Sequence, residues 1–337
     1  MKIQREFARH ILFTGAGFTK NFGGLLANEM WSKIFNNRRV QDHTRLMELL
    51  RTDFDYESIY HQVINGNYTN EEKDSINTAI NESYKVLDDI VREWTFHSGA
   101  PYPVNIYGVN RFIERFSGNH ENGLFFTLNQ DLFIERHFNS VMIALNLPGV
   151  AKIPDNHKTI LKLPLENNDF KPLPTHDDLR AYLKANPINS ILPRTLNYIK
   201  LHGSFGWLSS TGTHMLVIGR QKESQISDEP LLSWYSSLFK EALSKPNRKL
   251  LVIGYGFIDH HINKVIVDSI NDFNLKLYVI SPSDQFAFFS KLKSIEHGEI
   301  IQQAVVGYFP YKLLDIFPQD QSESHAWREI VGSYFEN

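Results

Sequence analysis

Short apolar runs alternate with amphipathic segments along most of this chain. Five runs rich in Ile, Leu, Val and Phe predict strands, and most of them end at Gly, Asn or Ser: 9–14, 123–128, 196–201, 248–254 and 275–280. Helical spacing of apolar residues predicts helices at 21–37, 131–145, 229–245, 259–272 and 283–294. Near-continuous apolarity, as in Lys249–Ile253, is typical of a parallel strand covered on both faces. The alternation therefore predicts an α/β fold built on a doubly wound, Rossmann-like parallel sheet.

Two stretches interrupt this alternation. Residues 40–117 are mostly polar with helical spacing, so we predict a helical insertion between the first and second core strands. Residues 146–195 are rich in proline and polar side chains, and we predict an irregular excursion there with one short helix. The rest divides into a core, residues 1–39 and 118–300, and a C-terminal extension, residues 301–337, with a strand and one or two helices.

The composition narrows the possible function classes. The chain has 337 residues, with 35 Lys and Arg against 38 Asp and Glu, and this balance gives no reason to expect direct nucleic-acid binding. It has no cysteine, which excludes disulfides, a thiol nucleophile and a cysteine zinc site. The N-terminal residues lack the apolar stretch of a signal peptide, and no apolar run reaches membrane-spanning length. We therefore expect a cytoplasmic protein without a membrane partner.

The first strand leads directly into a glycine turn, Gly15-Ala16-Gly17, and a segment with helical spacing follows. A strand, a tight glycine turn and a helix start can hold a pyrophosphate, because glycine lets the backbone approach the anion closely. The complete dinucleotide fingerprint has a third glycine where Lys20 stands here. This segment alone therefore fits a glycine turn in an ordinary α/β protein equally well.

Three further motifs follow later strands, and their order is more specific than the glycine turn. They are Thr127–Glu135, with Asn-Gln-Asp, Lys200–Trp207, with His-Gly-Ser, and Leu250–Asn263, with Gly-Tyr-Gly-Phe. Together with the first turn they resemble the sirtuin NAD-binding fold over roughly half of the chain. The similarity is greater to the sirtuin-like NAD hydrolases of bacterial anti-phage defence systems than to the protein deacylases. It implies a sirtuin-like parallel sheet in which the helical insertion replaces the zinc module.

Asn129 and His202 are the candidate catalytic residues. A side-chain amide can accept a hydrogen bond from water while it donates to a ribose hydroxyl, and the resemblance implies that Asn129 orients the attacking water. An Asx turn or a cap of the helix expected near Asp131 is the alternative for Asn129. A histidine can accept a proton near neutral pH, and the resemblance implies that His202 is the catalytic histidine.

The remaining candidates would bind the dinucleotide. Gly254-Tyr255-Gly256 ends one strand and opens a helix, which offers a second backbone site for phosphate or ribose. The resemblance implies phosphate contact at Thr19 and adenosine-ribose contact at Ser281. It places Asp131 near the nicotinamide, although aspartate is also a common helix cap. The full predicted binding set is Gly15, Ala16, Gly17, Phe18, Thr19, Asp131, Gly254, Tyr255, Gly256 and Ser281.

No metal and no cofactor besides NAD as substrate are expected. Adjacent residues on a helix, such as His260 and His261, point about 100° apart and do not easily chelate one ion. The zinc module of deacylating sirtuins needs four cysteines. Leu26 and Asn28 stand where those enzymes carry Asp and Arg, and Gly256 replaces their usual hydroxyl residue. Water is therefore the expected acceptor, with nicotinamide and ADP-ribose as products.

The resemblance implies a biological role that the residues alone do not. We expect an NAD glycohydrolase that acts as the effector of an anti-phage, abortive-infection system. Control would come from homo-oligomerisation or from a partner such as a HerA-type ATPase or a short Argonaute, with residues 40–117 as the candidate assembly surface. The alternatives are a non-catalytic sensor that binds NAD or ADP-ribose, and an ADP-ribosyltransferase or deacylase. A dehydrogenase fits least, because nothing marks a second substrate domain.

Overall fold

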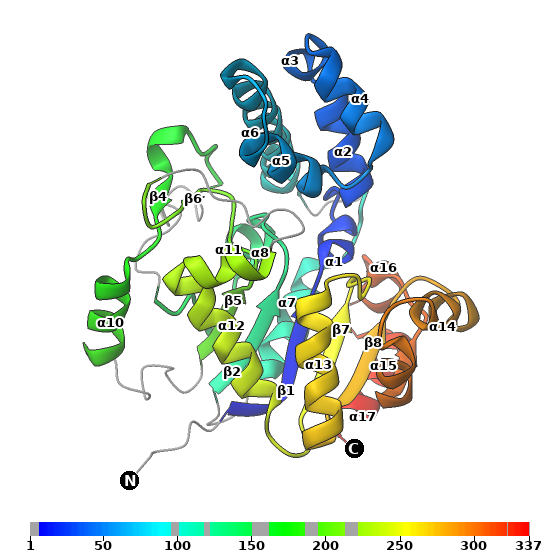
Figure 1. Ribbon diagram of the computed structural model, residues 1–337. Helices are drawn as coiled ribbons and strands as arrows, with labels where there is room; N and C mark the ends of the chain where they lie inside the picture. The colour runs from blue at the N-terminus through cyan, green and yellow to red at the C-terminus, as the bar shows by residue number, and fades with distance from the viewer. Residues whose placement is uncertain are drawn as a thin grey trace.

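A seven-stranded parallel sheet forms the centre of the computed structural model (Figure 1), in the strand order β3-β5-β2-β1-β7-β8-β9. The structure describes residues 7–95, 101–117, 122–149, 162–185, 195–212, 222–321 and 323–336. The strands of the sheet are β1 Phe7–Thr14, β2 Asn122–Thr127, β3 Ala144–Asn146, β5 Thr195–Lys200, β7 Lys249–Ile253, β8 Lys276–Ile280 and β9 Val305–Phe309. Two short strands, β4 Lys171–Pro172 and β6 Trp207–Leu208, pair separately.

The sheet is buried on both faces because its strands are apolar at successive positions. On β1, Leu12 belongs to one core cluster, whereas its neighbours Ile11 and Phe13 belong to the other. Every residue of β5 and of β7 is buried. Side chains alternate between the faces of a strand, so this pattern requires helices on both sides of the sheet. The α/β, doubly wound arrangement expected from the sequence is confirmed.

Helices cover the two faces of the sheet (Figure 1). Three helices with residues in one core cluster pack on one face: α12 Pro230–Leu243, α13 His260–Phe273 and α15 Gly298–Ala304. Helices with residues in the other cluster include α1 Ala16–Lys20, α7 Ile106–Glu114, α8 Phe133–His137, α16 Leu313–Ile316 and α17 His325–Tyr334. The remaining elements outside the insertion are α10 His176–Ala185, α11 Lys222–Asp228, α14 Gln285–Lys293 and the 3-10 turns η1 Arg115–Ser117 and η2 Asn167–Asp169.

Five helices between β1 and α7 rise beyond the carboxyl ends of the strands (Figure 1): α2 Ala27–Phe35, α3 Arg38–Gln41, α4 Thr44–Thr52, α5 Tyr56–Asn65 and α6 Asn70–Glu93. The longest, α6, begins with a capping box, in which Thr69 accepts from the backbone N–H of Glu72 and the Glu72 carboxylate accepts from the N–H of Thr69. The division of the chain into core, insertion, excursion and extension stays a prediction.

Sequence and structure agree best at the strands. All five predicted strands are observed within a few residues of their expected bounds, and helices are observed within 229–245 and 283–294 and at 260–273. Parts of the predicted excursion, residues 150–161 and 186–194, lie outside the described residues. None of the helices in the described part of the chain combines the length and apolarity that a membrane span needs.

Two predicted helices were wrong in extent. Residues 21–26 form a turn that includes Gly23, with φ +90°, and α2 begins only at Ala27. The helix predicted at 131–145 ends at His137, and the chain then turns around Ser140, whose Oγ accepts from the N–H groups of Met142 and Ile143. It continues as β3, an edge strand. The apolar residues of this segment do not form one buried helical face: Val141 and Met142 are exposed, whereas Ile143 and Leu145 pack partly buried against the core.

Tyr334 fastens the C-terminal helix to the middle of the sheet. The pairing of β1 with β2 is irregular between Phe7 and Ile11. The hydroxyl of Tyr334 accepts from the N–H of Ile11 (3.0 Å) and lies 2.9 Å from the carbonyl oxygen of Lys249, to which it donates. The Lys249 ammonium in turn donates to the carbonyl of Tyr334 (2.8 Å). One buried hydroxyl thus joins α17 to two central strands.

We predict that Tyr334→Phe lowers the free energy of unfolding by about 1–3 kcal/mol, because it leaves buried backbone groups without their partner. The control is Tyr311→Phe, which removes an exposed hydroxyl that donates to Glu329 and should change stability by less than about 0.5 kcal/mol. Urea denaturation measures both. Equal effects of the two substitutions would contradict the role given to Tyr334.

Candidate functional site

A cavity of about 1470 Å³ lies at the carboxyl ends of the central strands. The loops that follow five neighbouring strands each contribute a residue that was singled out from the sequence: Gly15 after β1, Asn129 after β2, His202 after β5, Gly254 after β7 and Ser281 after β8. Ligands of doubly wound sheets bind at this edge, where the strand order reverses. Its volume exceeds that of an ordinary small-molecule pocket, roughly 300–1,000 Å³, so the cavity has room for a dinucleotide.

The first glycine turn packs directly against the loop after β7. The N–H of Gly15 donates to the carbonyl of Ile253 (3.0 Å), and the N–H of Gly17 donates to that of Gly254 (2.9 Å). Gly254 has φ +67°, and a Cβ there would lie 2.2 Å from the backbone nitrogen of Phe18. Side chains at these glycines would therefore push the two loops apart. The backbone N–H groups of Gly15 and Gly17 are therefore used in this contact between the loops and do not point into the cavity.

Asn129 is held by its neighbours and keeps one acceptor unused. Its backbone N–H donates to the Oγ1 of Thr127 (3.0 Å), and its side-chain Nδ2 donates to the Oγ1 of Thr19 (2.9 Å). Its Oδ1 is buried and has no hydrogen-bond partner among the described residues. An unsatisfied buried acceptor costs about 1–3 kcal/mol, so such atoms are rare outside functional sites. The oxygen is a ready acceptor for a bound hydroxyl or water.

The side chain of Asn129 does not cap a helix, because its Nδ2 donates to Thr19 and its Oδ1 accepts no hydrogen bond from the described residues. The turn before α8 is capped by Asp131, whose Oδ1 accepts from the N–H of Phe133 (2.9 Å). Thr19 also hydrogen-bonds to the Asp131 carboxyl, so one hydroxyl links Asn129 and Asp131. Burial raises the pKa of Asp131 above its ordinary value, although the nearby Lys200 ammonium opposes this.

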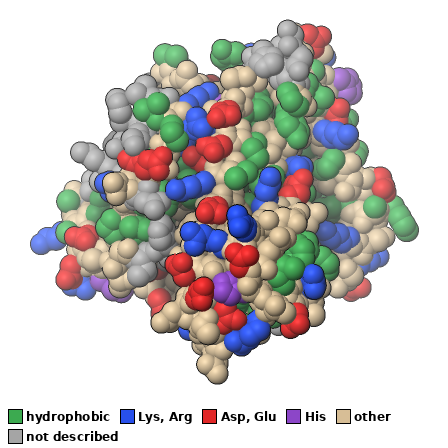
Figure 2. Space-filling model, turned by 90° about the horizontal axis from the view of Figure 1, so that it is seen from above, with side chains coloured by type: hydrophobic (Ala, Val, Ile, Leu, Met, Phe, Trp, Pro, Cys, Tyr) green, Lys and Arg blue, Asp and Glu red, His purple; other side chains and the backbone are tan. Residues whose placement is uncertain are grey.

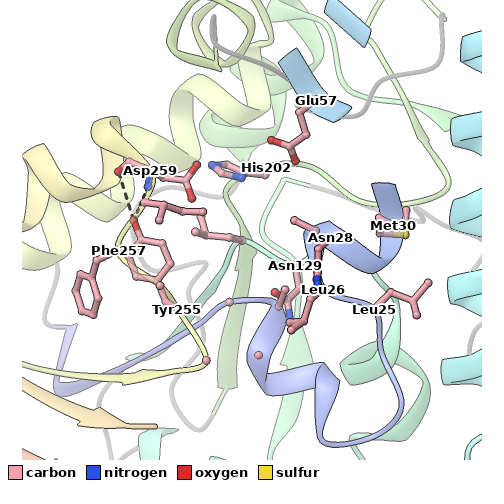
Figure 3. Close-up of a pocket in the computed structure, with 18 of the residues that line it drawn as sticks. Leu25, Leu26, Asn28, Met30, Glu57, Asn129, His202, Tyr255, Phe257 and Asp259 are labelled. Atoms are coloured by element: carbon pink, nitrogen blue, oxygen red, sulfur yellow. Dashed lines mark hydrogen bonds between the residues drawn. The ribbon is translucent and has the colours of Figure 1, made fainter. Parts of the chain in front are cut away.

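His202 follows β5 and is buried beside a second histidine. Its Nε2 lies 3.0 Å from the Nε2 of His261, near the start of α13, so one ring donates and the other accepts. Burial lowers the pKa of His202 to about 3 and also lowers that of His261. Both imidazoles are therefore neutral at physiological pH. Figure 3 shows His202 and Asp259 facing one another at one end of the cavity, with Glu57 beside them.

Lys222 joins the helical insertion to the core across this end of the cavity. Its ammonium lies 2.6 Å from the Oδ1 of Asp259 and 2.9 Å from the Oε2 of Glu57. Burial opposes the charge of Lys222, but the two carboxylates raise its pKa above the ordinary value. Burial likewise favours protonation of Asp259, and its neighbours His202 and Lys222 together lower its pKa. The result is a partly buried ion network that spans three separate segments.

The structure brings most of the predicted residues together. Ala16, Tyr255, Gly256, Asp131 and Ser281 line the cavity with the residues already described. Phe18 instead packs against Phe22 and Phe133, and Thr19 is buried behind Asn129. Leu26 and Asn28 also line the cavity (Figure 3). The assignment of these residues to NAD stays a prediction.

The sequence did not lead us to select His261, Glu57, Lys222 or Asp259 as site residues. Asp259 does precede α13, but its side chain makes no cap hydrogen bond. His260 and His261 diverge as expected, since His260 lies 3.0 Å from Glu296 while His261 faces His202. The spacing Asp-x-His at a helix start was the available signal. No sequence pattern around Lys222 or Glu57 indicated a role in the site, because their partners lie far away in the sequence.

The face of the molecule over the sheet edge carries mixed charge. Seen from above in Figure 2, acidic and basic side chains are interspersed over its described part. Glu57 and Lys222 belong to the lining of the cavity, and His260 lies at the surface near its mouth.

Comparison with known proteins gives one family. A family model described as SIR2-like domain matches residues 123–300, from β2 into α15. This range includes Asn129, His202 and Gly254, whereas the turn at Gly15 precedes it. A search of curated proteins finds no match to the chain.

We predict that Gly254→Ala lowers the free energy of unfolding by about 2–5 kcal/mol, because alanine is strained at this φ and its Cβ collides with the first glycine turn. The matched control is Gly256→Ala, two residues away, whose Cβ would meet only the Cγ2 of Ile258 at 3.9 Å. That variant should stay within about 0.5 kcal/mol of wild type in urea denaturation. If Gly254→Ala unfolded at the wild-type urea midpoint, the close contact between the two loops would not be required for stability.

Proposed function

The chain belongs to the SIR2-like domain family, and from that premise we propose that its cavity binds NAD and hydrolyses it to nicotinamide and ADP-ribose. The observation that carries the proposal is the shared position of Asn129 and His202. They follow the neighbouring strands β2 and β5 and line one cavity, together with the glycine turn after β1. The family match by itself supports an NAD-related role.

The reaction asks little of a protein beyond positioning. The nicotinamide of NAD is a positively charged pyridinium, and it leaves as a neutral molecule. Cleavage of the C1′–N bond builds positive charge on the ribose, as in glycoside hydrolysis. The electron pair of that bond goes to the ring nitrogen, and the water oxygen forms the new bond to C1′. An enzyme therefore needs to hold the ribose, place a water and accept its proton.

Asn129 is suited to place the water or a ribose hydroxyl. Thr19 fixes the orientation of its amide by accepting from Nδ2, which leaves Oδ1 as the acceptor. A hydrogen bond from water to this oxygen would also satisfy a buried atom that has no partner among the described residues. Substrate binding would thus offset the free-energy cost of leaving the buried Oδ1 of Asn129 without a hydrogen bond.

His202 is suited to accept the proton. Because burial keeps its imidazole neutral, the form that can act as a base prevails at physiological pH. A weak base is sufficient here, since the developing oxocarbenium ion is a strong electrophile and makes the attacking water acidic.

The charges at this end of the cavity favour a cationic ring. Glu57 and Asp259 carry two carboxylates against the single ammonium of Lys222, which leaves a local charge of about −1 where the residues are partly shielded from solvent. The positively charged nicotinamide would be attracted there, and the pyrophosphate would lie toward the glycine turns. Such an orientation places the ribose between Asn129 and His202.

Water is the proposed acceptor because the chain lacks parts of a deacylase. Deacylating sirtuins carry a zinc module that needs four cysteines, and this chain has no cysteine. Leu26 and Asn28 line the cavity at the places of the Asp and Arg of deacylating sirtuins. We further propose that the activity serves anti-phage defence by abortive infection in the cytoplasm. Homo-oligomerisation, a HerA-type ATPase or a short Argonaute would restrain it, because uncontrolled NAD loss is toxic.

A second candidate function follows from the contact between His202 and His261. The Nε2 of His202 is engaged by another side chain in this structure, as would suit a module that binds NAD or ADP-ribose and reports it to a partner. Such a module would bind nucleotide and release no nicotinamide. An ADP-ribosyltransferase would instead transfer label from NAD to protein.

We predict that Asn129→Ala and His202→Ala each reduce nicotinamide release from NAD by about 100-fold or more, because each removes a group that acts on the water. Both variants should remain folded by circular dichroism and should still bind ADP-ribose in calorimetry. His325→Ala, on the exposed start of α17, is the control with unchanged turnover. Wild-type rates in both site variants would overturn the assignment.

We also predict an unusual pH dependence. The pKa of His202 is about 3, so its imidazole stays neutral as the pH is lowered. We therefore expect kcat/KM to stay constant from about pH 8 down to about pH 5. An ordinary histidine base, with a pKa of about 6.5, would lose activity within this range. The pKa values of His10 and His137 are also lowered, to about 4. Below about pH 6.5 these histidines bind protons in the unfolded chain but stay neutral in the folded protein. The free energy of unfolding should therefore decrease as the pH is lowered below about 6.5.

Circular dichroism at each pH separates the two effects. A loss of kcat/KM with a midpoint near pH 6.5 in protein that is still folded would contradict a buried, neutral His202.

A further inference from the structure

Three donor groups converge at the end of the cavity where His202 lies. The imidazole nitrogens of His202 and His261 and a carboxylate oxygen of Asp259 all lie within 4.8 Å of one another. His202 is buried and the other two are half-buried, so the donors are fixed by the fold and are not a loose surface group. His202 comes from the loop after β5, and the other two come from the start of α13, more than fifty residues later.

The two imidazoles already point their Nε2 atoms at each other. At 3.0 Å they share one proton, which sits between two nitrogen lone pairs. Zinc binds imidazole nitrogen at about 2.0–2.1 Å, and two nitrogens on a tetrahedral ion are then about 3.3 Å apart. An ion could therefore take the place of the hydrogen bond between the two rings once the donating ring carries its proton on Nδ1 instead of Nε2. The rings then turn toward the ion, and the two nitrogens separate by a few tenths of an ångström.

The surroundings offer the right charge for a divalent ion. Lys222 stands close, but it occupies the Oδ1 of Asp259 and also pairs with Glu57. Among the described residues the second carboxylate oxygen of Asp259 has no hydrogen-bond partner, and the two carboxylates exceed the single ammonium in charge.

We propose that His202, Asp259 and His261 form a binding site for a transition-metal ion such as Zn²⁺, and that occupation of this site switches the enzyme off. Two imidazoles and one carboxylate suit zinc, nickel and cobalt and do not suit magnesium or calcium, which prefer all-oxygen sites. Three protein ligands leave a fourth position for water.

The inhibitory part of the proposal rests on the proposed function. The metal binds the Nε2 lone pair of His202, so the imidazole can no longer take the proton of the attacking water. The ion also adds positive charge where the cationic nicotinamide would lie. Both effects act against NAD cleavage, and removal of the ion by a chelator reverses them.

Cobalt binding tests the site without reference to activity. Chelator-treated full-length protein is titrated with Co²⁺, and visible absorption bands report ligation by protein nitrogen. We expect one Co²⁺ per chain in wild type, displacement by Zn²⁺ and none by Mg²⁺. His261→Gln and Asp259→Asn should each weaken binding on the order of tenfold or more. The matched control is His260→Gln, because His260 pairs with Glu296 at the surface and should leave binding unchanged.

Wild-type affinity in both His261→Gln and Asp259→Asn, or no ligand-field bands in wild type, would overturn the metal site. The activity arm uses wild type and His260→Gln only, with Zn²⁺ and then EDTA during NAD turnover. Full turnover at saturating Zn²⁺ would overturn the inhibitory role. Cobalt binding without any nicotinamide release would leave the site standing and reject the proposed function instead.

Discussion

The close contact between the loops after β1 and β7 is the constraint on which the rest of the site depends. Gly15 and Gly17 donate across it to the carbonyls of Ile253 and Gly254, and no side chain fits between the two backbones. The contact lies where the strand order of the sheet reverses. It therefore fixes the floor of the cavity and the starting points of both α1 and α13.

Each chemical group of the site is positioned relative to that contact. On α1, Thr19 holds the amide of Asn129, and at the start of α13 His261 meets His202. Helices α2, α5 and α6 complete the enclosure from above, and Glu57 on α5 reaches the core through Lys222. A shift of one loop would thus move the amide, the imidazole and the ion network together.

The same enclosure determines the chemistry. Burial keeps His202 neutral, and it leaves the Oδ1 of Asn129 without a hydrogen-bond partner among the described residues. Both features cost stability on folding, and both suit the proposed hydrolysis, which needs one oriented water and one neutral base. His202, the proposed proton acceptor, is also one of the three residues of the proposed metal site, with His261 and Asp259.

The strands and the residues at their ends could be predicted from the sequence, because apolar runs that stop at Gly, Asn or His report directly on buried strands and on the ligand edge. Asn129, His202 and Gly254 were selected from the motifs that follow these strands, together with the resemblance to the sirtuin fold that the motifs carry. Glu57 and Lys222 could not be found, since their contact depends on how the insertion packs over the core. His261 was dismissed with His260 as a poor chelating pair, but its actual partner comes from another loop. The helix expected at 131–145 ends early because the side chain of Ser140 accepts from the N–H groups of Met142 and Ile143 and turns the chain after α8.

A crystal structure of the chain with ADP-ribose tests the central claim most directly. We expect the distal ribose to lie within hydrogen-bond distance of Asn129 and His202, with the pyrophosphate beside the turns at Gly15 and Gly254. Nucleotide bound outside this cavity, or with its distal ribose turned away from both side chains, would contradict it.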